Sequence, residues 1–202
     1  MVQDRTSIGS IAIRFVDQPA QSGPGVIGWE LTDIDDGSID GLLSIGTTAD
    51  PVAPANHPNG VSRMDHVVIM TPDLGRTTAA LRGFGFSPRR TRDVPGSEPL
   101  RRQTFFWAGE TILEVVGPVD ATGNSPATIW GLALTTDDMD AAVETLGQSL
   151  SRPKPAVQAG RQIATIDTKA LGIGPALALM TPHISEDDIP KDDIPEDGLG
   201  ED

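Results

Sequence analysis

An internal repeat in the middle of the chain limits the fold more than any other feature of this sequence. Segment 64–81 reads MDHVVIMTPDLGRTTAAL and segment 129–146 reads IWGLALTTDDMDAAVETL, and the two align without a gap. Each copy has alternating apolar residues, then an Asp-containing turn, then a helical pattern. The repeat predicts two copies of one supersecondary unit that begins with a strand and a helix. Asp73 and Asp137 are expected to start the helices, because a short carboxylate accepts hydrogen bonds from the free amides of a first turn.

The repeat continues beyond the two helices. Residues 102–106 (RQTFF) and 161–165 (RQIAT) each predict a strand, and so do residues 111–118 (TILEVVGP) and 175–182 (PALALMTP). Each copy is therefore predicted to be a strand, a helix and a meander of three strands.

The first strand of each predicted meander is the least regular. It corresponds to residues 88–94 in the first copy and to residues 150–157, interrupted by proline, in the second. Proline cannot donate to a strand ladder, so these strands are expected at the edges of a sheet.

Alternation along the predicted strands assigns their residues to two faces. One face is uniformly large and aliphatic, as packing under a helix requires, and the other is small, mixed or ionisable, as the lining of a cavity would be. His66 and Glu114 lie on this second face. The apolar and small residues predicted to line the cavity with them are Val68, Met70, Ile112, Gly131, Ala133 and Ala178. Asp65 and Trp130 alternate to the other face, where Asp65 is no candidate ligand and Trp130 is interpreted as a core residue.

The predicted fold is α+β, with tandem βαβββ modules that form a curled mixed sheet around a cavity, and with an extra N-terminal β meander. The modules are placed at residues 61–120 and 127–184. Residues 1–60 are predicted to contain strands at 8–16, 26–33 and 39–47, followed by a proline-rich linker. We expect this segment to pack on the modules, because it is too short to bury a good core alone.

Charge and composition exclude several classes of function. The chain has a net charge of −14, which disfavours nucleic acid and anionic membrane surfaces as partners, and it has no cysteine, which excludes disulfides and thiolate metal sites. Residues 185–202 carry much of that charge and are predicted to be an acidic disordered tail. No apolar run could span a membrane and no signal peptide precedes the first strand, so a cytoplasmic protein is expected.

The motifs MDHVVIMTPDL and TILEVVGP resemble those of the glyoxalase-like vicinal oxygen chelate superfamily, over about residues 61–182. The resemblance implies paired βαβββ modules whose sheets surround a common cavity that binds a small organic molecule. In the metal-using members, a His in the first strand and a Glu in the last strand of a module are ligands. By position, these residues correspond to His66 and Glu114, which would hold a divalent metal ion whose identity the sequence leaves open.

The second module departs from that pattern, because Gly131 and Ala178 occupy the positions of His66 and Glu114. Half of the expected four-ligand set is therefore absent. His57 or His183 could complete the site, and so could the amide oxygen of Gln103 or Gln162. A homodimer in which two first modules pair is a further alternative, and a metal-free His66–Glu114 pair is another.

Two Arg-Gln pairs are candidates for ligand binding, since they occupy matching strands of the two modules. Arg102 and Gln103, and likewise Arg161 and Gln162, are expected to reach an anionic or carbonyl-bearing ligand.

The sequence leaves three functional hypotheses open. The first is a metal-dependent lyase, isomerase or dioxygenase, in which the metal polarises a carbonyl or vicinal oxygen of the substrate, or Glu114 moves a proton beside it. The second is a non-catalytic protein of the bleomycin-resistance type that sequesters a small ligand, which the small cavity residues favour. The third is an interaction protein that uses its acidic tail.

Overall fold

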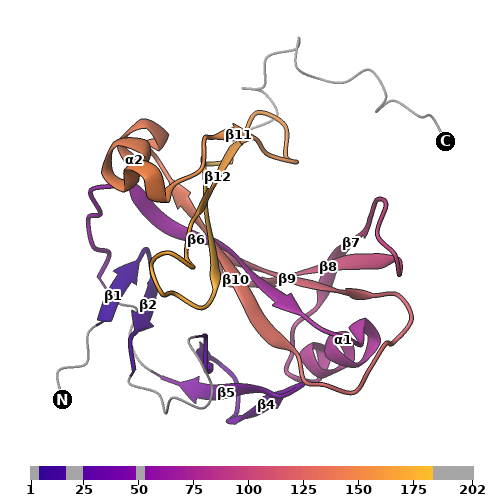
Figure 1. Cartoon of the computed structure of the whole chain (residues 1–202). Helices are drawn as coiled ribbons and strands as arrows, with labels where there is room; N and C mark the ends of the chain where they lie inside the picture. Colours follow the sequence, from indigo (N-terminus) through magenta and orange to yellow (C-terminus); the bar gives the residue numbers. More distant parts are fainter. Residues whose placement is uncertain (1–4, 17–24, 49–52, 184–202) are drawn as a thin grey trace.

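Two strand–helix–three-strand modules lie side by side in one eight-stranded mixed sheet (Figure 1). The structure is a computed structural model that describes residues 5–16, 25–48 and 53–183. The first module contributes β6 (Val61–Met70), β7 (Pro88–Val94), β8 (Arg101–Ala108) and β9 (Thr111–Pro118). The second contributes β10 (Thr128–Thr136), β11 (Lys154–Pro155), β12 (Gln162–Ile166) and β13 (Ala176–Met180).

The strand order reflects the repeat. It runs β11-β12-β13-β10-β6-β9-β8-β7, so each half of the sheet holds one module in mirrored order. The first strands β6 and β10 meet antiparallel at the centre, and each pairs in parallel with the last strand of its own module, β9 or β13. The predicted α+β class with tandem βαβββ modules is confirmed. The sheet is open, with β7 and β11 at its edges, so the residues expected to line a cavity lie on one face of an open sheet.

Both helices cover the same face of this sheet. Helix α1 (Leu74–Gly83) begins at Asp73, whose side chain accepts a 2.8 Å hydrogen bond from the amide of Arg76. Helix α2 (Met139–Leu146) begins at Asp138, whose side chain accepts from the amide of Ala141. The prediction was correct for Asp73 and wrong for Asp137, which lies one residue before the N-cap, too early to reach the first-turn amides. A short 3₁₀ turn, η1 (Gly147–Ser149), follows α2.

The apolar core forms two clusters between the helices and the sheet. The cluster under α1 includes Leu81, Ile69 and Val115, all fully buried. The cluster under α2 includes Ala142 and Leu179, also fully buried. Ile69, Val115 and Leu179, which lie on strands, belong to the large aliphatic face assigned from the sequence. Because this face is buried under the helices, the opposite face is free for the candidate site.

The N-terminal segment forms two small sheets rather than one meander. A hairpin joins β1 (Arg5–Ile8) and β2 (Ile11–Arg14), and a three-stranded sheet has the order β3-β5-β4. These strands are β3 (Trp29–Thr32), β4 (Gly37–Ile39) and β5 (Leu42–Thr47). This sheet is not a meander, because β3 pairs with β5, in parallel, instead of with β4, the next strand along the chain. The prediction missed the tight turns, in which Gly9 and the pair Asp40–Gly41 adopt positive φ and allow two-residue hairpin loops.

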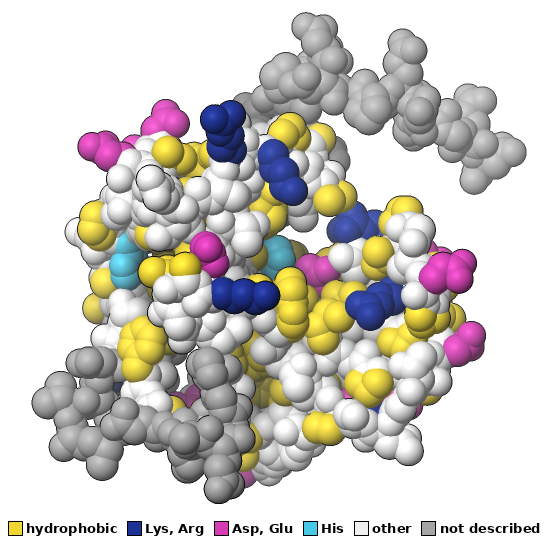
Figure 2. Space-filling model, in the orientation of Figure 1, with side chains coloured by type: hydrophobic (Ala, Val, Ile, Leu, Met, Phe, Trp, Pro, Cys, Tyr) yellow, Lys and Arg dark blue, Asp and Glu magenta, His cyan; other side chains and the backbone are white. Residues whose placement is uncertain are grey.

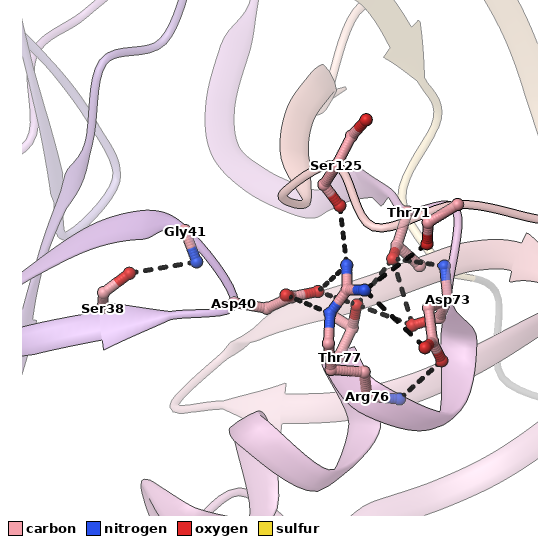
Figure 3. Close-up of polar contacts among 9 residues, drawn as sticks. Ser38, Asp40, Gly41, Thr71, Asp73, Arg76, Thr77 and Ser125 are labelled. Carbon is pink, nitrogen blue, oxygen red and sulfur yellow. Dashed lines mark hydrogen bonds and ion pairs between the residues drawn. The ribbon is translucent and has the colours of Figure 1, made fainter. Parts of the chain in front are cut away.

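The turn between β4 and β5 docks on the start of α1 (Figure 3). The carboxylate of Asp40 accepts hydrogen bonds from Nε of Arg76 at 2.6 Å and from the hydroxyl of Thr77 at 2.5 Å. The same guanidinium donates to the carbonyl oxygen of Ser125 at 2.6 Å. Three segments distant in sequence therefore meet at one ion pair, and Ile39 and Leu42 beside the turn are buried in the core under α1.

The described part of residues 1–60 packs on the modules, as predicted. Ile8 of β1 is buried in the cluster under α2, and Ile39 of β4 is buried under α1. The predicted acidic tail, residues 185–202, lies outside the described residues. Among the described residues, no helix is long and apolar enough to cross a membrane.

Candidate functional site

His66 on β6 and Glu114 on β9 converge on the face of the sheet that carries no helix. Their nearest atoms, Nε2 of His66 and Oε2 of Glu114, are 3.5 Å apart, and both side chains are partly accessible, with 16% and 14% of their surfaces exposed. The strands are parallel neighbours in which His66 pairs with Ile112 and Glu114 pairs with Val68, so the two residues are diagonal neighbours on one face. The geometry agrees with the prediction that they approach within the reach of one ion.

Asp65 also reaches this face, although alternation assigned it to the other. Its Oδ1 atom lies 2.8 Å from Nδ1 of His66. The pairing of β6 with β10 explains the error: Ala133 pairs with His66 and Leu134 pairs with Met64, so Asp65 is the extra residue of a β-bulge. A bulge turns two consecutive side chains toward the same side of a sheet, which re-aims Asp65 toward His66.

Arg161, just before β12, pairs with Asp65 from the second module. Its Nη2 atom donates to Oδ2 of Asp65 at 2.5 Å, and both side chains are almost completely buried. Burial acts to raise the pKa of Asp65, but hydrogen bonds from His66 and Arg161 outweigh it and hold that pKa well below its usual range. Asp65 is therefore an ionised acceptor at neutral pH, and the hydroxyl of Thr135 donates a further, 3.3 Å hydrogen bond to it.

Within the first module, Gln103 of β8 forms a hydrogen bond with Glu114. Its amide Nε2 donates to Oε1 of Glu114 at 2.5 Å, and its Oε1 accepts from Nε of Arg92 on β7 at 2.8 Å. Since the oxygen of Gln103 faces Arg92, its amide nitrogen must face Glu114. A continuous row of polar side chains thus crosses the sheet face in the order Arg92, Gln103, Glu114, His66, Asp65 and Arg161.

The hydrogen bond to Asp65 determines which ring nitrogen of His66 carries a proton. An ionised carboxylate only accepts, so Nδ1 of His66 carries a proton. In a neutral imidazole, Nε2 would then present a lone pair to the carboxylate of Glu114. A proton on Nε2, a cation, or a donor group of a bound molecule is needed between these two atoms to make the approach favourable.

The donor set of a single chain does not suit a resident divalent metal. Two donors that each lie about 2.1 Å from a tetrahedral ion are about 3.4 Å apart, which the His66–Glu114 separation would allow. However, catalytic sites use three protein ligands, and no group of three His, Cys, Asp or Glu residues that could hold an ion occurs in the described ranges. The corresponding positions in the second module are Gly131 and Ala178, whose side chains cannot coordinate.

The alternative ligands considered from the sequence do not complete such a site. His57 lies away from it, with Nε2 2.7 Å from the carbonyl oxygen of Ser7 in β1. His183 does approach, with Nε2 3.2 Å from Nη1 of Arg161 and 3.9 Å from Oδ2 of Asp65. Burial, together with the guanidinium of Arg161, lowers the pKa of His183. Because Asp65 is already bound to Arg161 and His66, His183 adds a neighbour to the buried ion pair rather than a ligand beside Glu114.

Three of the four predicted ligand-binding residues are not free to contact a ligand at this site. Arg161 is buried and bound to Asp65. Arg102 lies on the helix side of β8, since it alternates with Gln103, and it forms an ion pair with Asp93. Gln162 shares the helix side of β12 with Ala164, which is buried under α2. Of the four, only Gln103 contacts the central pair, so the expectation for the other three is corrected.

Small side chains surround the pair on the second module, as predicted. On β10, Ala133 pairs with His66 of β6 and Gly131 pairs with Val68 of β6. On β13, Ala178 pairs with Ala133. A Cβ atom built on Gly131 would lie 3.0 Å from the carbonyl oxygen of Ala176, so this position has little space for a larger side chain. Met70 and Ile112 are both partly buried on the strands that carry His66 and Glu114.

One face of the molecule is hollowed near its middle (Figure 2). In the space-filling view, a histidine and an acidic side chain meet in a notch near the middle of this face, and Lys or Arg side chains stand around it (Figure 2). Pockets of about 260 and 550 Å³ lie elsewhere on the described structure, and neither is lined by His66 or Glu114. Trp130, interpreted from the sequence as core, is 55% exposed because a second irregularity in the β6–β10 pairing leaves it unpaired.

Comparison with known proteins adds a family match. The sequence model of the Glyoxalase/Bleomycin resistance protein/Dioxygenase superfamily matches residues 65–165, which is half of the chain and runs from β6 of the first module into β12 of the second. The match includes His66, Glu114 and the bulge residue Asp65. No curated protein matches the sequence.

Solved structures with a similar fold include several enzymes. Methylmalonyl-CoA epimerase from Mycobacterium tuberculosis is 19% identical, with a TM-score of 0.48 over 64% of this chain and 94% of that one. A mutant of 4-hydroxymandelate synthase from Streptomyces coelicolor is 10% identical, with a TM-score of 0.50 over 74% of this chain and 60% of that one. At these identities the likeness concerns the fold alone.

Proposed function

The chain belongs to the Glyoxalase/Bleomycin resistance protein/Dioxygenase superfamily, and from this premise we propose that it binds a small carbonyl compound and moves a proton beside the carbonyl group. One observation carries the proposal: Nε2 of His66 and Oε2 of Glu114 face each other at 3.5 Å on an accessible face, while the far side of each group is already held. The reaction class is that of a lyase or isomerase.

The two residues have complementary roles in this proposal. In this proposal His66 is the imidazolium ion, with a proton on each ring nitrogen between the carboxylates of Asp65 and Glu114. The carboxylate of Glu114 takes the proton from the carbon next to the carbonyl, and Nε2–H of His66 donates to the carbonyl oxygen, where negative charge develops. Returning the proton from Glu114 to a different position completes an isomerisation. Atoms and charge balance without a metal, and no step depends on one.

The residues behind the pair make its geometry suitable for this chemistry. Asp65 accepts from Nδ1 of His66 and so orients Nε2 toward the reacting group, while Arg161 holds Asp65 in place. Gln103 donates to Oε1 of Glu114 and leaves Oε2 as the free oxygen. Such supporting hydrogen bonds hold catalytic groups in the orientation that the reaction needs.

Solvent deuterium exchange tests the proposal. The probe is 4-acetylbenzoate, a stable aromatic ketone with exchangeable protons beside its carbonyl, and ¹H NMR follows their replacement in D₂O. The full-length protein should accelerate the exchange above the buffer rate. Glu114→Gln should reduce that acceleration by about 10²-fold or more, since a general base contributes that much. Exchange by Glu114→Gln at the rate of the unmodified protein would contradict the proposal.

A non-catalytic binder is the second candidate, and the small residues on the second module favour it. Ala133 and Ala178 present only methyl groups beside His66, and with Gly131 they supply no reactive group. A protein that binds the probe without accelerating exchange, and whose affinity for it falls in Glu114→Gln, would establish this function instead of the enzymatic one.

A further inference from the structure

Three arginines gather on the site side of the edge strand β7 and its neighbour β8. On β7, Arg92 pairs with Gln103 and Arg90 pairs with Phe105, and both partners lie on the face of Glu114. Arg101 is two residues before Gln103 on the regular strand β8, so it lies on the same face. We call Arg90, Arg92 and Arg101 the arginine face. All three side chains are exposed.

The arginine face is connected to the proposed catalytic pair through Gln103. Arg92 donates through Nε to Gln103, which in turn donates to Glu114. The guanidinium of Arg90 lies over the ring of Phe105, 5.0 Å from its centre. Phe105 pairs with Glu114 across the β8–β9 contact. A molecule that contacts Arg90 or Arg92 would therefore also reach the carboxylate of Glu114.

In the described part of this strongly acidic chain, these three arginines have no acidic partner. Among the residues that the structure describes, no carboxylate lies within ion-pair distance of Arg90, Arg92 or Arg101, whereas Arg102 is paired with Asp93 on the helix side of the same strands. Like charges gathered on neighbouring strands repel one another. A planar guanidinium group is suited to bind a carboxylate or phosphate through two parallel hydrogen bonds, and such an anion would relieve the repulsion.

Aromatic side chains lie between the arginine face and His66. Phe105 and Trp107 share the site side of β8, because the residue between them, Phe106, is 1% exposed in the core under α1. Trp107 pairs with Ile112, which pairs with His66, and it remains 47% exposed. The exposed indole and the neighbouring ring offer an apolar surface for a flat part of a ligand.

We propose that the arginine face is the anion subsite of the His66–Glu114 site, so that the ligand is an organic anion with a flat apolar body. The anionic group binds at Arg90, Arg92 and Arg101, the body lies on Phe105 and Trp107, and the carbonyl reaches His66 and Glu114. This inference rests on the proposed function, because it assigns the ligand class of that same site.

Binding of 4-acetylbenzoate and of its neutral methyl ester tests the assignment, with titration calorimetry as the measurement. The full-length protein should bind the anion more tightly than the ester, and added NaCl should weaken only the binding of the anion. Substituting Arg90→Gln and Arg101→Gln together should weaken binding of the anion by about tenfold or more, since the loss of one charge-assisted hydrogen bond already weakens binding by about that factor. The affinity for the ester should not change.

Arg102→Gln is the matched control, because Arg102 is the neighbour of Arg101 on the same strand and faces the helix side. It should leave the affinity for the anion unchanged. Equal losses in Arg101→Gln and Arg102→Gln would show an effect of net charge and would overturn the assignment. Failure of the unmodified protein to prefer the anion would also overturn it, and aggregation of the arginine variants with unchanged affinity would mean that the arginines only protect the sheet edge.

The two proposals fail in different ways. Loss of anion binding in the arginine variants, together with normal deuterium exchange by Glu114→Gln, would support the anion subsite and reject the proposed chemistry. Equal binding of anion and ester by the arginine variants and the unmodified protein, together with loss of exchange in Glu114→Gln, would reject the subsite alone.

Discussion

Nδ1 of His66 lies 2.8 Å from Oδ1 of Asp65, its neighbour in the chain, although consecutive residues of a strand normally point to opposite faces. The bulge opposite Ala133 and Leu134 produces this relationship. It places an ionised carboxylate behind the imidazole and links the first module to Arg161 of the second. The stability of the fold and the orientation of His66 therefore depend on the same side chain.

Replacing Asp65 should destabilise the protein strongly. Asp65→Asn should lower the free energy of unfolding by about 3–5 kcal/mol at pH 7, because the buried guanidinium of Arg161 would lose its charged partner. Urea denaturation followed by circular dichroism measures the effect. Asp93→Asn removes the exposed partner of Arg102 and is the control, for which a much smaller change is expected.

The contribution of Asp65 should also depend on pH in a defined direction. Its pKa is lower in the folded protein than in the unfolded chain, so the unfolded chain takes up the proton first as the pH falls. The stabilisation is therefore fully present above the unfolded value of about 3.9 and is lost as the pH falls below it. Urea denaturation at pH 6 and at pH 3 should show a smaller difference between Asp65→Asn and the unmodified protein at pH 3. An equal difference at both values would contradict the ion pair.

The turn that docks the N-terminal sheet should be intolerant of a side chain at Gly41. This residue has φ +89°, and an added Cβ would lie 2.2 Å from Cβ of Pro126. Gly85 has nearly the same φ, +91°, and open space around it. Gly85→Ala should cost about 1 kcal/mol from backbone strain alone, and Gly41→Ala should cost clearly more. Similar melting temperatures for the two variants would mean that the turn does not press on Pro126.

The ion pair between Asp40 and Arg76 should contribute measurably to the docking of the N-terminal sheet on α1. Asp40→Ala should lower the free energy of unfolding by about 2 kcal/mol, because the carboxylate accepts from both Arg76 and Thr77. Ser125→Ala is the control, since Arg76 contacts only the backbone oxygen of Ser125. Thermal unfolding of the two variants would show whether the pair holds the segments together. A melting temperature of Asp40→Ala as high as that of Ser125→Ala would show that it does not.

The incomplete donor set predicts weak metal binding that one substitution can strengthen. Zn²⁺ added to the unmodified protein should be removed by dialysis, because His66 and Glu114 supply only two donors. Ala178→Glu places a carboxylate at the position that corresponds to Glu114 in the second module, and it should raise the affinity for Zn²⁺ in calorimetry. The gain should vanish in the variant that combines Ala178→Glu with His66→Ala. An equal gain in that variant would mean that the new carboxylate binds zinc elsewhere.

The repeat by itself determined the architecture of the two modules. Its apolar periods are local properties of the chain, so they predicted the strand–helix–three-strand order, the buried face and the common face of His66 and Glu114. The proline pattern likewise placed the irregular strands at the sheet edges, where β7 and β11 lie.

Only the tertiary structure decided the surroundings of the pair. The bulge at Asp65 depends on how β6 pairs with β10, and Arg161 reaches Asp65 across 96 residues of sequence, so neither contact follows from local alternation. The tight turns at Gly9 and at Asp40–Gly41 replaced the expected meander in the same way, because a two-residue loop is selected by backbone geometry and by the partner strand. Periodicity predicts the side of a strand on which a residue lies as long as the pairing stays regular, whereas a shift in register is set by the neighbouring strand.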